Sequence, residues 1–172
     1  MMIFNYKSKW LNERALKRLP VSLKRNLIDN CSLTKRIYET KASKINHISS
    51  KFILSNKFNL CKRKYIYKRT VVLKRDLNEP IYATSYISAT NLKGSMNYIK
   101  YLGNKSLATI LYKRWPFSKQ SVSYNISNGV VKRKTLYTKK HIKIIVEENF
   151  PINNSYRSIS LFNCRKNFIN GR

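Results

Sequence analysis

Acidic residues are scarce in this sequence, and so are glycine, proline and cysteine. Asp and Glu together number 7, against 36 Lys and Arg, so the 172-residue chain carries a net charge of +29. With only four Gly and four Pro, collagen-like and linker-like sequences are excluded. The hydrophobic fraction of 42 %, with 12 Tyr and 7 Phe, suits a folded globule rather than a disordered basic tail.

The few cysteines and histidines limit the redox and metal chemistry. Cys31, Cys61 and Cys164 follow no CxxC or Cys/His spacing, and their odd number argues against a disulfide framework and for a reducing compartment. With only His47 and His141 in addition, we expect no metal site. We also expect Cys31 and both histidines to have no catalytic role.

Long apolar runs are absent too, so the sequence predicts no transmembrane helix. The start of the chain, MMIFNYKSKW, is too short in its apolar part for a signal peptide, and we expect an intracellular or organellar protein. The length fits a single domain over residues 1–172, with a core from about 10 to 156 and a loosely held tail over 157–172.

The excess of Lys and Arg has two interpretations. Basic residues neutralise phosphates, so nucleic-acid binding is one. The other is compositional, because Lys, Asn, Ile, Tyr and Phe all have codons built from A and T alone and are plentiful here. An AT-biased genome would give such a chain without any phosphate contact, but it does not explain the scarcity of acids. Charge alone leaves both interpretations open.

The N-terminal part has a helical pattern. Leu16, Leu23 and Leu27 recur at roughly helical spacing within residues 10–30. Pro20 interrupts this pattern, because proline disrupts a helix interior but is accepted in the first turn. The sequence therefore predicts two short helices, with Pro20 opening the second.

After the first helices the pattern becomes that of strands. β-branched and aromatic residues alternate in part with polar ones, and the segments DLNEP, SNG and KK between them are typical of turns. The DLNEP turn predicts an antiparallel hairpin between its two flanking strands. We expect strands over 34–42, 45–53, 63–75, 81–88, 122–126, 130–138 and 141–150.

Two short helices are expected inside this series of strands. The first, over 92–103, places its apolar residues on one stripe and ends at Gly103. The second, over 105–114, has Ser106 as a possible N-cap and ends before Pro116. Together these patterns predict an α+β fold with an antiparallel sheet of about six strands, N-terminal helices and two inserted helices.

Three segments, taken in order, resemble one known family. They are LIDNCSLTKRI, then EPIYATSYISATNLKGSMNYIKYLGNKSLATILY, then VVKRKTLYTKKHIKIIVEENFP, and they span most of residues 23–151. They are similar to the LxxxxSMTKRF, GEPW…LGxxPLGxxLF and GRRSxxxxxGxPLxxxExFLP segments of the chorismate pyruvate-lyases. The Ala-x-Ser of the hairpin strand resembles a divergent branch found in cyanobacteria and in plastid-encoded reading frames. The AT-biased composition fits the plastid version.

The resemblance implies a six-stranded antiparallel sheet with helices on one side and a ligand bound in an enclosed pocket. Family members cleave chorismate to 4-hydroxybenzoate and pyruvate without a metal or an organic cofactor, driven by aromatisation of the ring. A protein that does this must desolvate and orient a dianion and stabilise charge on the departing fragment.

The resemblance also implies a pocket carboxylate on the last strand, a fixed step before the proline that ends it. Glu147 occupies that position, and we expect it to donate a hydrogen bond to the ring oxygen or to transfer a proton. Strand alternation favours Glu148 instead, because Glu148 shares a face with the apolar Ile144 and Val146. An exposed acid that pairs with a lysine is the third possibility.

Two leucines match substrate-binding positions of the family. Leu33, in CSLTKRI, matches an apolar pocket residue that is usually Met, and Leu107, in KSLATIL, matches a position whose backbone can meet a ligand carboxylate. Ordinary core packing would explain either leucine equally well. Ala108 stands where the family has Gly, and its Cβ would crowd a close backbone contact.

The cation needed for an anionic ligand is less clear. Ser85 stands where the resemblance implies an arginine, and a hydroxyl can bind a carboxylate without neutralising it. Lys132 and Arg133 match paired arginines of the family and are the expected substitutes, with Arg36 as a further candidate. Each of these charges would also suit an exposed surface.

The resemblance therefore predicts a chorismate lyase acting on an aromatic dicarboxylate, without cofactor, as a monomer in the plastid stroma, or in the cytoplasm if bacterial. One alternative is a catalytically impaired protein of the same fold that binds an aromatic acid. Another is a basic RNA- or ribosome-associated protein, which the net charge of +29 suggests.

Overall fold

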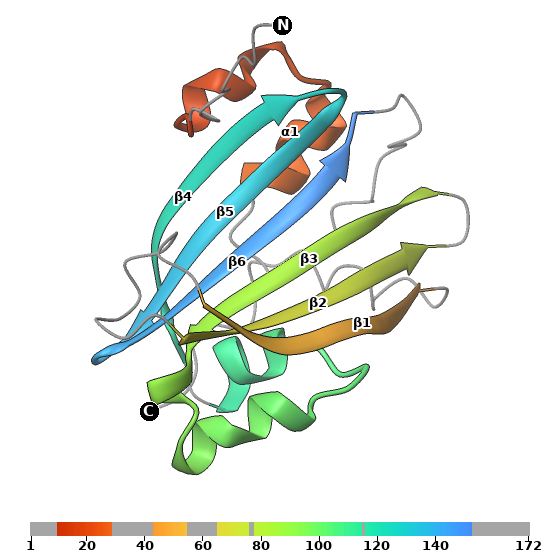
Figure 1. The fold of residues 1–172 in the computed structure, drawn as a ribbon. Coiled ribbons are helices and arrows are strands. Elements are labelled where there is room, and N and C mark those ends of the chain that lie inside the picture. Colours follow the sequence, from red (N-terminus) through yellow and green to blue (C-terminus); the bar gives the residue numbers. More distant parts are fainter. Residues whose placement is uncertain (1–9, 29–42, 55–64, 76–77, 115, 153–172) are drawn as a thin grey trace, which may run out of the picture.

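The fold is organised around one antiparallel sheet of six strands (Figure 1). The computed structural model describes residues 10–28, 43–54, 65–75, 78–114 and 116–152. Among these residues the strands are β1 (Ser43–Leu54), β2 (Tyr65–Arg75), β3 (Asn78–Ser88), β4 (Ser118–Ser127), β5 (Val130–Lys139) and β6 (Ile142–Pro151).

The strand order is β1-β2-β3-β6-β5-β4, so the sheet consists of two three-stranded meanders joined where β3 pairs with β6. Two of the turns within the second meander match the sequence expectation. Asn128 and Gly129, both with positive φ, connect β4 to β5, and Lys140, at φ 52°, lies between β5 and β6. Asn-Gly is favoured there because a two-residue hairpin turn needs the left-handed region.

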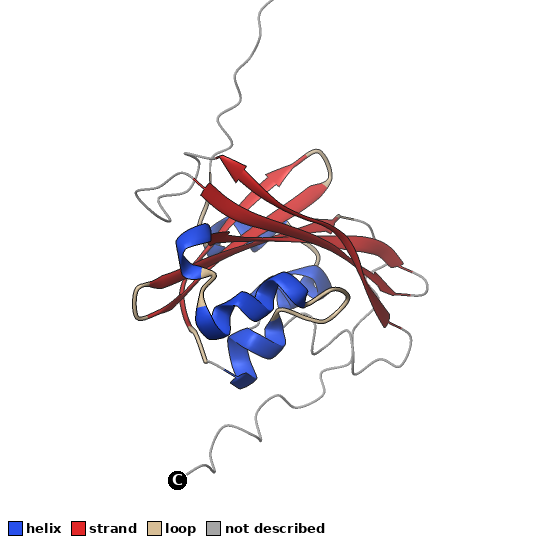
Figure 2. Cartoon of the chain, turned by 60° about the horizontal axis from the view of Figure 1, so that its bottom comes forward, coloured by secondary structure: helices blue, strands red, loops and turns tan. Residues whose placement is uncertain are grey.

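Helices cover one face of this sheet, which we call the inner face (Figure 2). The chain enters through a 3-10 helix, η1 (Glu13–Arg18), with Asn12 as its N-cap, and through α1 (Val21–Ile28). Between β3 and β4 it forms two 3-10 helices, η2 (Ala89–Asn91) and η3 (Gly94–Tyr101), and a π-helix, η4 (Thr109–Arg114).

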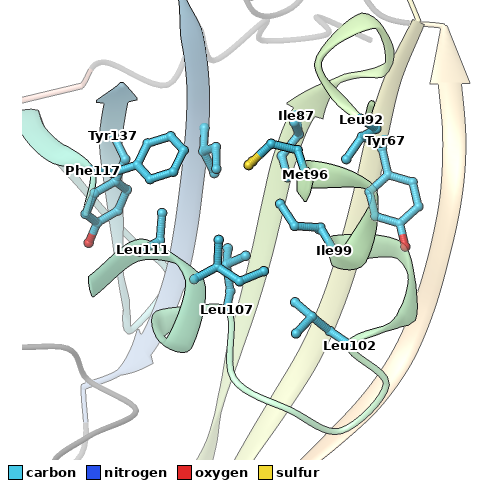
Figure 3. Packing of buried hydrophobic residues seen from close by; sticks show 12 residues of the cluster. Tyr67, Ile87, Leu92, Met96, Ile99, Leu102, Leu107, Leu111, Phe117 and Tyr137 are labelled. Carbon is cyan, nitrogen blue, oxygen red and sulfur yellow. The ribbon is translucent and has the colours of Figure 1, made fainter. Parts of the chain in front are cut away.

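Two apolar clusters pack on the inner face. The N-terminal cluster joins η1 and α1 to one end of the sheet, through residues such as Leu16, Leu27 and Phe150. The insert cluster joins η3 and η4 to the other end, through residues such as Ile99 and Leu107 (Figure 3). Burial of these side chains fixes the register of the strands, because a slip of one residue would turn every one of them to the opposite face.

The expected strands from residue 45 onward match β1 to β6, apart from shifts at their ends, and they form the six-stranded antiparallel sheet. The expected strand over 34–42 lies outside the described residues, as do parts of the DLNEP turn and the expected tail. The apolar stripe of the first inserted helix is buried in the insert cluster: Leu92, Met96, Ile99 and Leu102. The inserted helices are of the 3-10 and π types.

Candidate functional site

A cavity lies on the inner face, between the two apolar clusters. Its volume is about 60 Å³, which is room for several water molecules. Strand residues form its floor, and the segment from Lys105 to Tyr112 covers it. Its charged and hydrogen-bonding lining residues are Arg69, Ser85, Lys105, Ser106, Tyr112, Lys119, Arg133, Thr135, Tyr137 and Glu148.

The sheet register brings the polar residues into two neighbouring rows. One row pairs Arg69 on β2 with Ser85 on β3, and continues through β6 to Thr135 on β5. In the next row Glu148 on β6 and Arg133 on β5 are cross-strand partners. Side chains alternate between the two faces along a strand, so residues two positions apart share a face with each other and with their partners on the next strand. The middle of the inner face is therefore polar, while both of its ends are apolar.

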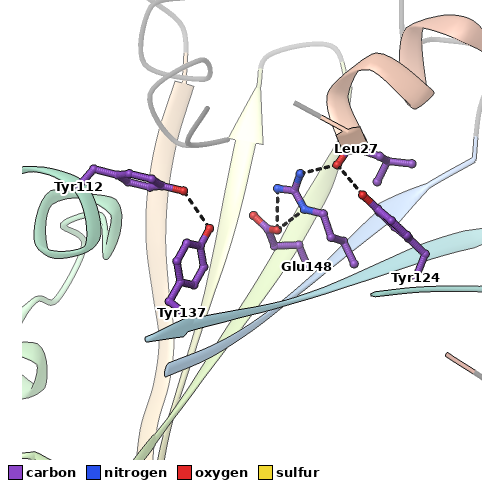
Figure 4. Close-up of polar contacts among 6 residues, drawn as sticks. Leu27, Tyr112, Tyr124, Tyr137 and Glu148 are labelled. Carbon is purple, nitrogen blue, oxygen red and sulfur yellow. Dashed lines mark hydrogen bonds and ion pairs between the residues drawn. The ribbon is translucent and has the colours of Figure 1, made fainter. Parts of the chain in front are cut away.

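Arg133 and Glu148 form a buried ion pair in the floor of the cavity (Figure 4). The Nε and the Nη2 atoms of Arg133 both lie 2.7 Å from the Oε2 atom of Glu148, and the two residues are 5 % and 8 % exposed. Burial alone would lower the pKa of the Arg133 guanidinium, but the adjacent Glu148 carboxylate raises that pKa above its usual value.

The same arginine also ties the site to the N-terminal helices. Its Nη1 donates to the carbonyl of Leu27 near the end of α1, at 3.0 Å, and the hydroxyl of Tyr124 donates to the same carbonyl at 3.1 Å. A helix leaves its last carbonyls without partners in the helix, so these donors stabilise its end. The ring of Phe150 lies 5.2 Å from the guanidinium carbon, which is within range of a cation–π contact.

Arg69 is the second buried cation of the cavity, and its surroundings differ. It is 3 % exposed, and its Nη2 donates to the carbonyls of Gly103 and Lys105, each at 2.8 Å. Its Nε has no hydrogen-bond partner among the described residues, and Arg69 forms no ion pair with any of them. Burial lowers the pKa of this guanidinium, which nevertheless stays charged in proteins.

Two tyrosines close the side of the cavity next to the insert cluster. The hydroxyls of Tyr112 and Tyr137 lie 2.9 Å apart and the rings meet edge to face (Figure 4). Burial raises the pKa of both phenols, so both rings stay neutral hydrogen-bonding groups. Lys119, paired with Tyr137 in the sheet register, brings a further amine to the lining, and burial followed by the nearby Arg133 lowers its pKa.

The cavity thus combines apolar residues, such as Leu107 and Val146, with buried cations and one carboxylate, and this lining suits a small anion with a ring. A family model described as chorismate lyase matches residues 4–160 of this sequence. The chain belongs to the chorismate lyase family. A comparison with curated proteins finds no significant match. Membership of the chorismate lyase family supports binding of a small aromatic molecule and agrees with the six-stranded antiparallel sheet.

The acid that lines the cavity is Glu148, although the resemblance implied Glu147 for that position. Glu147 does not line the cavity. It lies one residue along β6, on the opposite face, where the hydroxyl of Tyr86 donates to its Oε2 at 3.3 Å. Spacing from the final proline pointed to Glu147, whereas the alternation of apolar residues along β6 pointed to Glu148.

Some of the remaining expected site residues line the cavity and others do not. Leu107, Ser85 and Arg133 line the cavity, as does Ala108. Lys132 is exposed on the opposite face and does not line it, because it precedes Arg133 by one residue on β5. Leu33, Arg36 and Cys31 lie outside the described residues.

Several residues that line the cavity were not predicted from the sequence, and Arg69 is the most informative of them. Ser85 stands where the resemblance implies a pocket arginine, and its direct cross-strand partner Arg69 supplies a cation instead. The signal was present in YIYKRTVVLK, where Arg69 falls on the face of Tyr67, Val71 and Leu73. A charged residue at an otherwise apolar face position marks a functional candidate.

No helix among the described residues is long and apolar enough to cross a membrane. Within the same residues, no three or more His, Cys, Asp or Glu side chains gather as a metal site would require.

Proposed function

We propose that this protein cleaves chorismate to 4-hydroxybenzoate and pyruvate in the cavity on the inner face. The observation that carries the proposal is Arg69, a buried cation that has no ion-pair partner among the described residues, facing the same cavity as the Arg133–Glu148 pair. An isolated buried charge is costly. A ligand carboxylate would offset that cost, and a guanidinium suits a carboxylate in geometry as well as charge.

Arg69 takes the ring carboxylate in this proposal, with its Nε as one donor. The second carboxylate, on the enolpyruvyl group, lies toward Lys119, a further cation of the lining. Leu107, Val71 and Val146 contact the ring and exclude water from it. A dianion held between cations on two sides of the cavity has its ether bond oriented for cleavage. Because these charges are already in place, solvent does not have to reorganise during the reaction.

Glu148 is the group best suited to handle a proton. Cleavage breaks the ether bond, removes one proton from the ring and adds one to the leaving enolpyruvate, which becomes pyruvate. A carboxylate held by Arg133 at 2.7 Å has a fixed orientation and accepts hydrogen bonds. It would accept a hydrogen bond from the ring hydroxyl, take up the proton that leaves the ring carbon bearing that hydroxyl, and pass a proton to the methylene carbon of the leaving enolpyruvate, with the tyrosine pair bordering the same space.

The ion pair also supports a second candidate function. Because Arg133 already engages Glu148, the carboxylate is partly satisfied before any ligand binds. A protein that binds 4-hydroxybenzoate without turning over chorismate would have this arrangement too. The two functions differ in whether pyruvate is released.

The test incubates purified protein with chorismate and follows 4-hydroxybenzoate and pyruvate in equal amounts, while calorimetry measures 4-hydroxybenzoate binding. We expect Arg69→Met to weaken binding at least about ten-fold, as the loss of a charge-assisted contact predicts. Lys68→Met is the matched control, since Lys68 is the neighbouring residue on the opposite face of β2. No binding and no product with folded protein would refute the proposal, and binding without product would select the second candidate.

A further inference from the structure

The face of the sheet opposite the cavity, which we call the outer face, has its own chemical character. The described helices η1, α1, η3 and η4 pack on the inner face, through the two apolar clusters. Alternation along each strand places Lys68, Tyr82, Lys132 and Lys143 on the outer face. Of these, Tyr82, Lys132 and Lys143 are exposed.

Lysines face each other directly across two strands of this surface. Lys44 pairs with Lys74, and Lys51 pairs with Lys68, in the register of β1 and β2. Like charges directly opposite one another destabilise a sheet. A folded protein keeps such pairs at low cost where solvent screens them or where a bound anion offsets them.

Very little negative charge balances these lysines. Among the described side chains of the outer face the acid is Glu147, and the hydroxyl of Tyr86 donates to it. The lysines extend across the sheet, from Lys51 on β1 to Lys132 on β5. The face therefore presents a distributed positive charge, which fits an extended polyanion better than a single small anion.

Aromatic rings are interspersed with these charges. The side chain of Tyr82 is 45 % exposed and lies in one row with Asn149 and Lys132 on the next two strands. Trp10 reaches the same face, where the amine of Lys134 lies 4.1 Å from the centre of its ring. An exposed ring beside lysines, such as that of Tyr82, is what an unpaired base needs, because a base can stack on the ring while a lysine contacts its phosphate.

We propose that the outer face of the sheet binds single-stranded nucleic acid. Lysines of β1, β2, β5 and β6 contact the phosphates, and Tyr82 stacks on a base. This site lies on the opposite side of the sheet from the cavity and does not depend on the function proposed for it. It gives the scarcity of acids a physical reason that codon composition does not supply, since acidic residues on this face would repel phosphates.

The test is fluorescence anisotropy with labelled 12-nucleotide single-stranded RNA and DNA, titrated with the full chain at several salt concentrations. The double variant Lys51→Glu/Lys132→Glu should bind at least about ten-fold more weakly, with a shallower salt dependence. Its matched control is Lys17→Glu/Lys93→Glu, which changes the net charge equally at exposed positions on η1 and just before η3. The control should bind within about three-fold of the unmodified protein.

Tyr82→Ala isolates the stacking contact without changing any charge. It should lower the affinity for single strands about ten-fold and leave the affinity for duplex RNA unchanged. An equal loss in both double variants would overturn the proposal, because it would show a response to net charge alone. Equal affinity for polyglutamate or duplex RNA would also overturn it, as it would show general attraction to polyanions. Circular dichroism of each variant checks folding.

Discussion

The two buried arginines line the same cavity, but the groups that contact their guanidinium charges differ. Arg133 has a carboxylate at 2.7 Å, the carbonyl at the end of α1 and the ring of Phe150. Arg69 has two loop carbonyls and a buried Nε without a described partner. The comparison teaches that burial alone does not define a role. Glu148 neutralises Arg133 within the protein, whereas Arg69 has no counter-ion among the described residues.

The largest effect on stability should come from removing the carboxylate of the Arg133–Glu148 ion pair. Glu148→Ala leaves Arg133 buried without its counter-charge, and we expect a loss of about 3–5 kcal/mol in the free energy of unfolding. Urea denaturation followed by circular dichroism measures it. Glu147→Ala is the matched control, since Glu147 is half-buried on the opposite face, and its loss should stay below about 1 kcal/mol.

A double-mutant cycle makes this test more specific. Arg133→Met/Glu148→Leu removes both charges and keeps similar volumes, so it should recover most of the stability that Glu148→Ala loses. If the double variant is as unstable as the sum of the single changes, the pair contributes through packing rather than through its charges.

A smaller effect on stability is expected when Arg69 is replaced. Arg69→Met removes a buried charge that has no described counter-ion and leaves two loop carbonyls without their donor. These contributions oppose each other, so the free energy of unfolding without ligand should change by no more than about 1 kcal/mol. A loss as large as that of Glu148→Ala would show that Arg69 is structural and would remove the contrast between the two arginines.

A further effect, comparable in size to that of Arg69→Met, concerns the tyrosine pair at high pH. Burial, followed by the neighbouring Tyr112, raises the pKa of Tyr137 above its usual value of 10.0. A raised pKa in the folded state gives stability that is fully present below pH 10 and is lost as the pH rises above it. Tyr137→Phe should therefore unfold about 1 kcal/mol more easily at neutral pH, because its hydrogen bond is gone, but lose less stability above pH 10.

Denaturation curves from pH 8 to 11.5 measure this difference, with Tyr101→Phe as the control because Tyr101 is 72 % exposed. Parallel stability curves for Tyr137→Phe and the unmodified protein would contradict the assignment of the alkaline loss to this phenol.

Much of the fold could be predicted from local patterns. The alternation in β2 to β6 and the turn residues Asn128 and Gly129 are strong signals because each depends on a few neighbouring residues. The pairing of β3 with β6 could not be read this way, since it joins segments far apart in the chain. That pairing is what brings Ser85 next to Val146 and builds the cavity.

Motif spacing predicted part of the cavity lining. Leu107 and Arg133 were identified from motif spacing and do line the cavity. For Glu147 and Glu148 motif spacing and strand alternation disagreed, and the face of the strand decided the outcome. Arg69 was missed because motif spacing pointed to β3 for the cation, while the register between β2 and β3 is a tertiary feature that spacing does not encode.

The pairing of Arg69 with Ser85 has a consequence for how this pocket can change over evolutionary time. Neighbouring strands hold their paired residues only a few ångströms apart, so a guanidinium on either one can reach the same point in the cavity. The positive charge is then a property of the pair and not of a single alignment column. A substitution that looks like inactivation in one column can be silent when its cross-strand neighbour carries the charge.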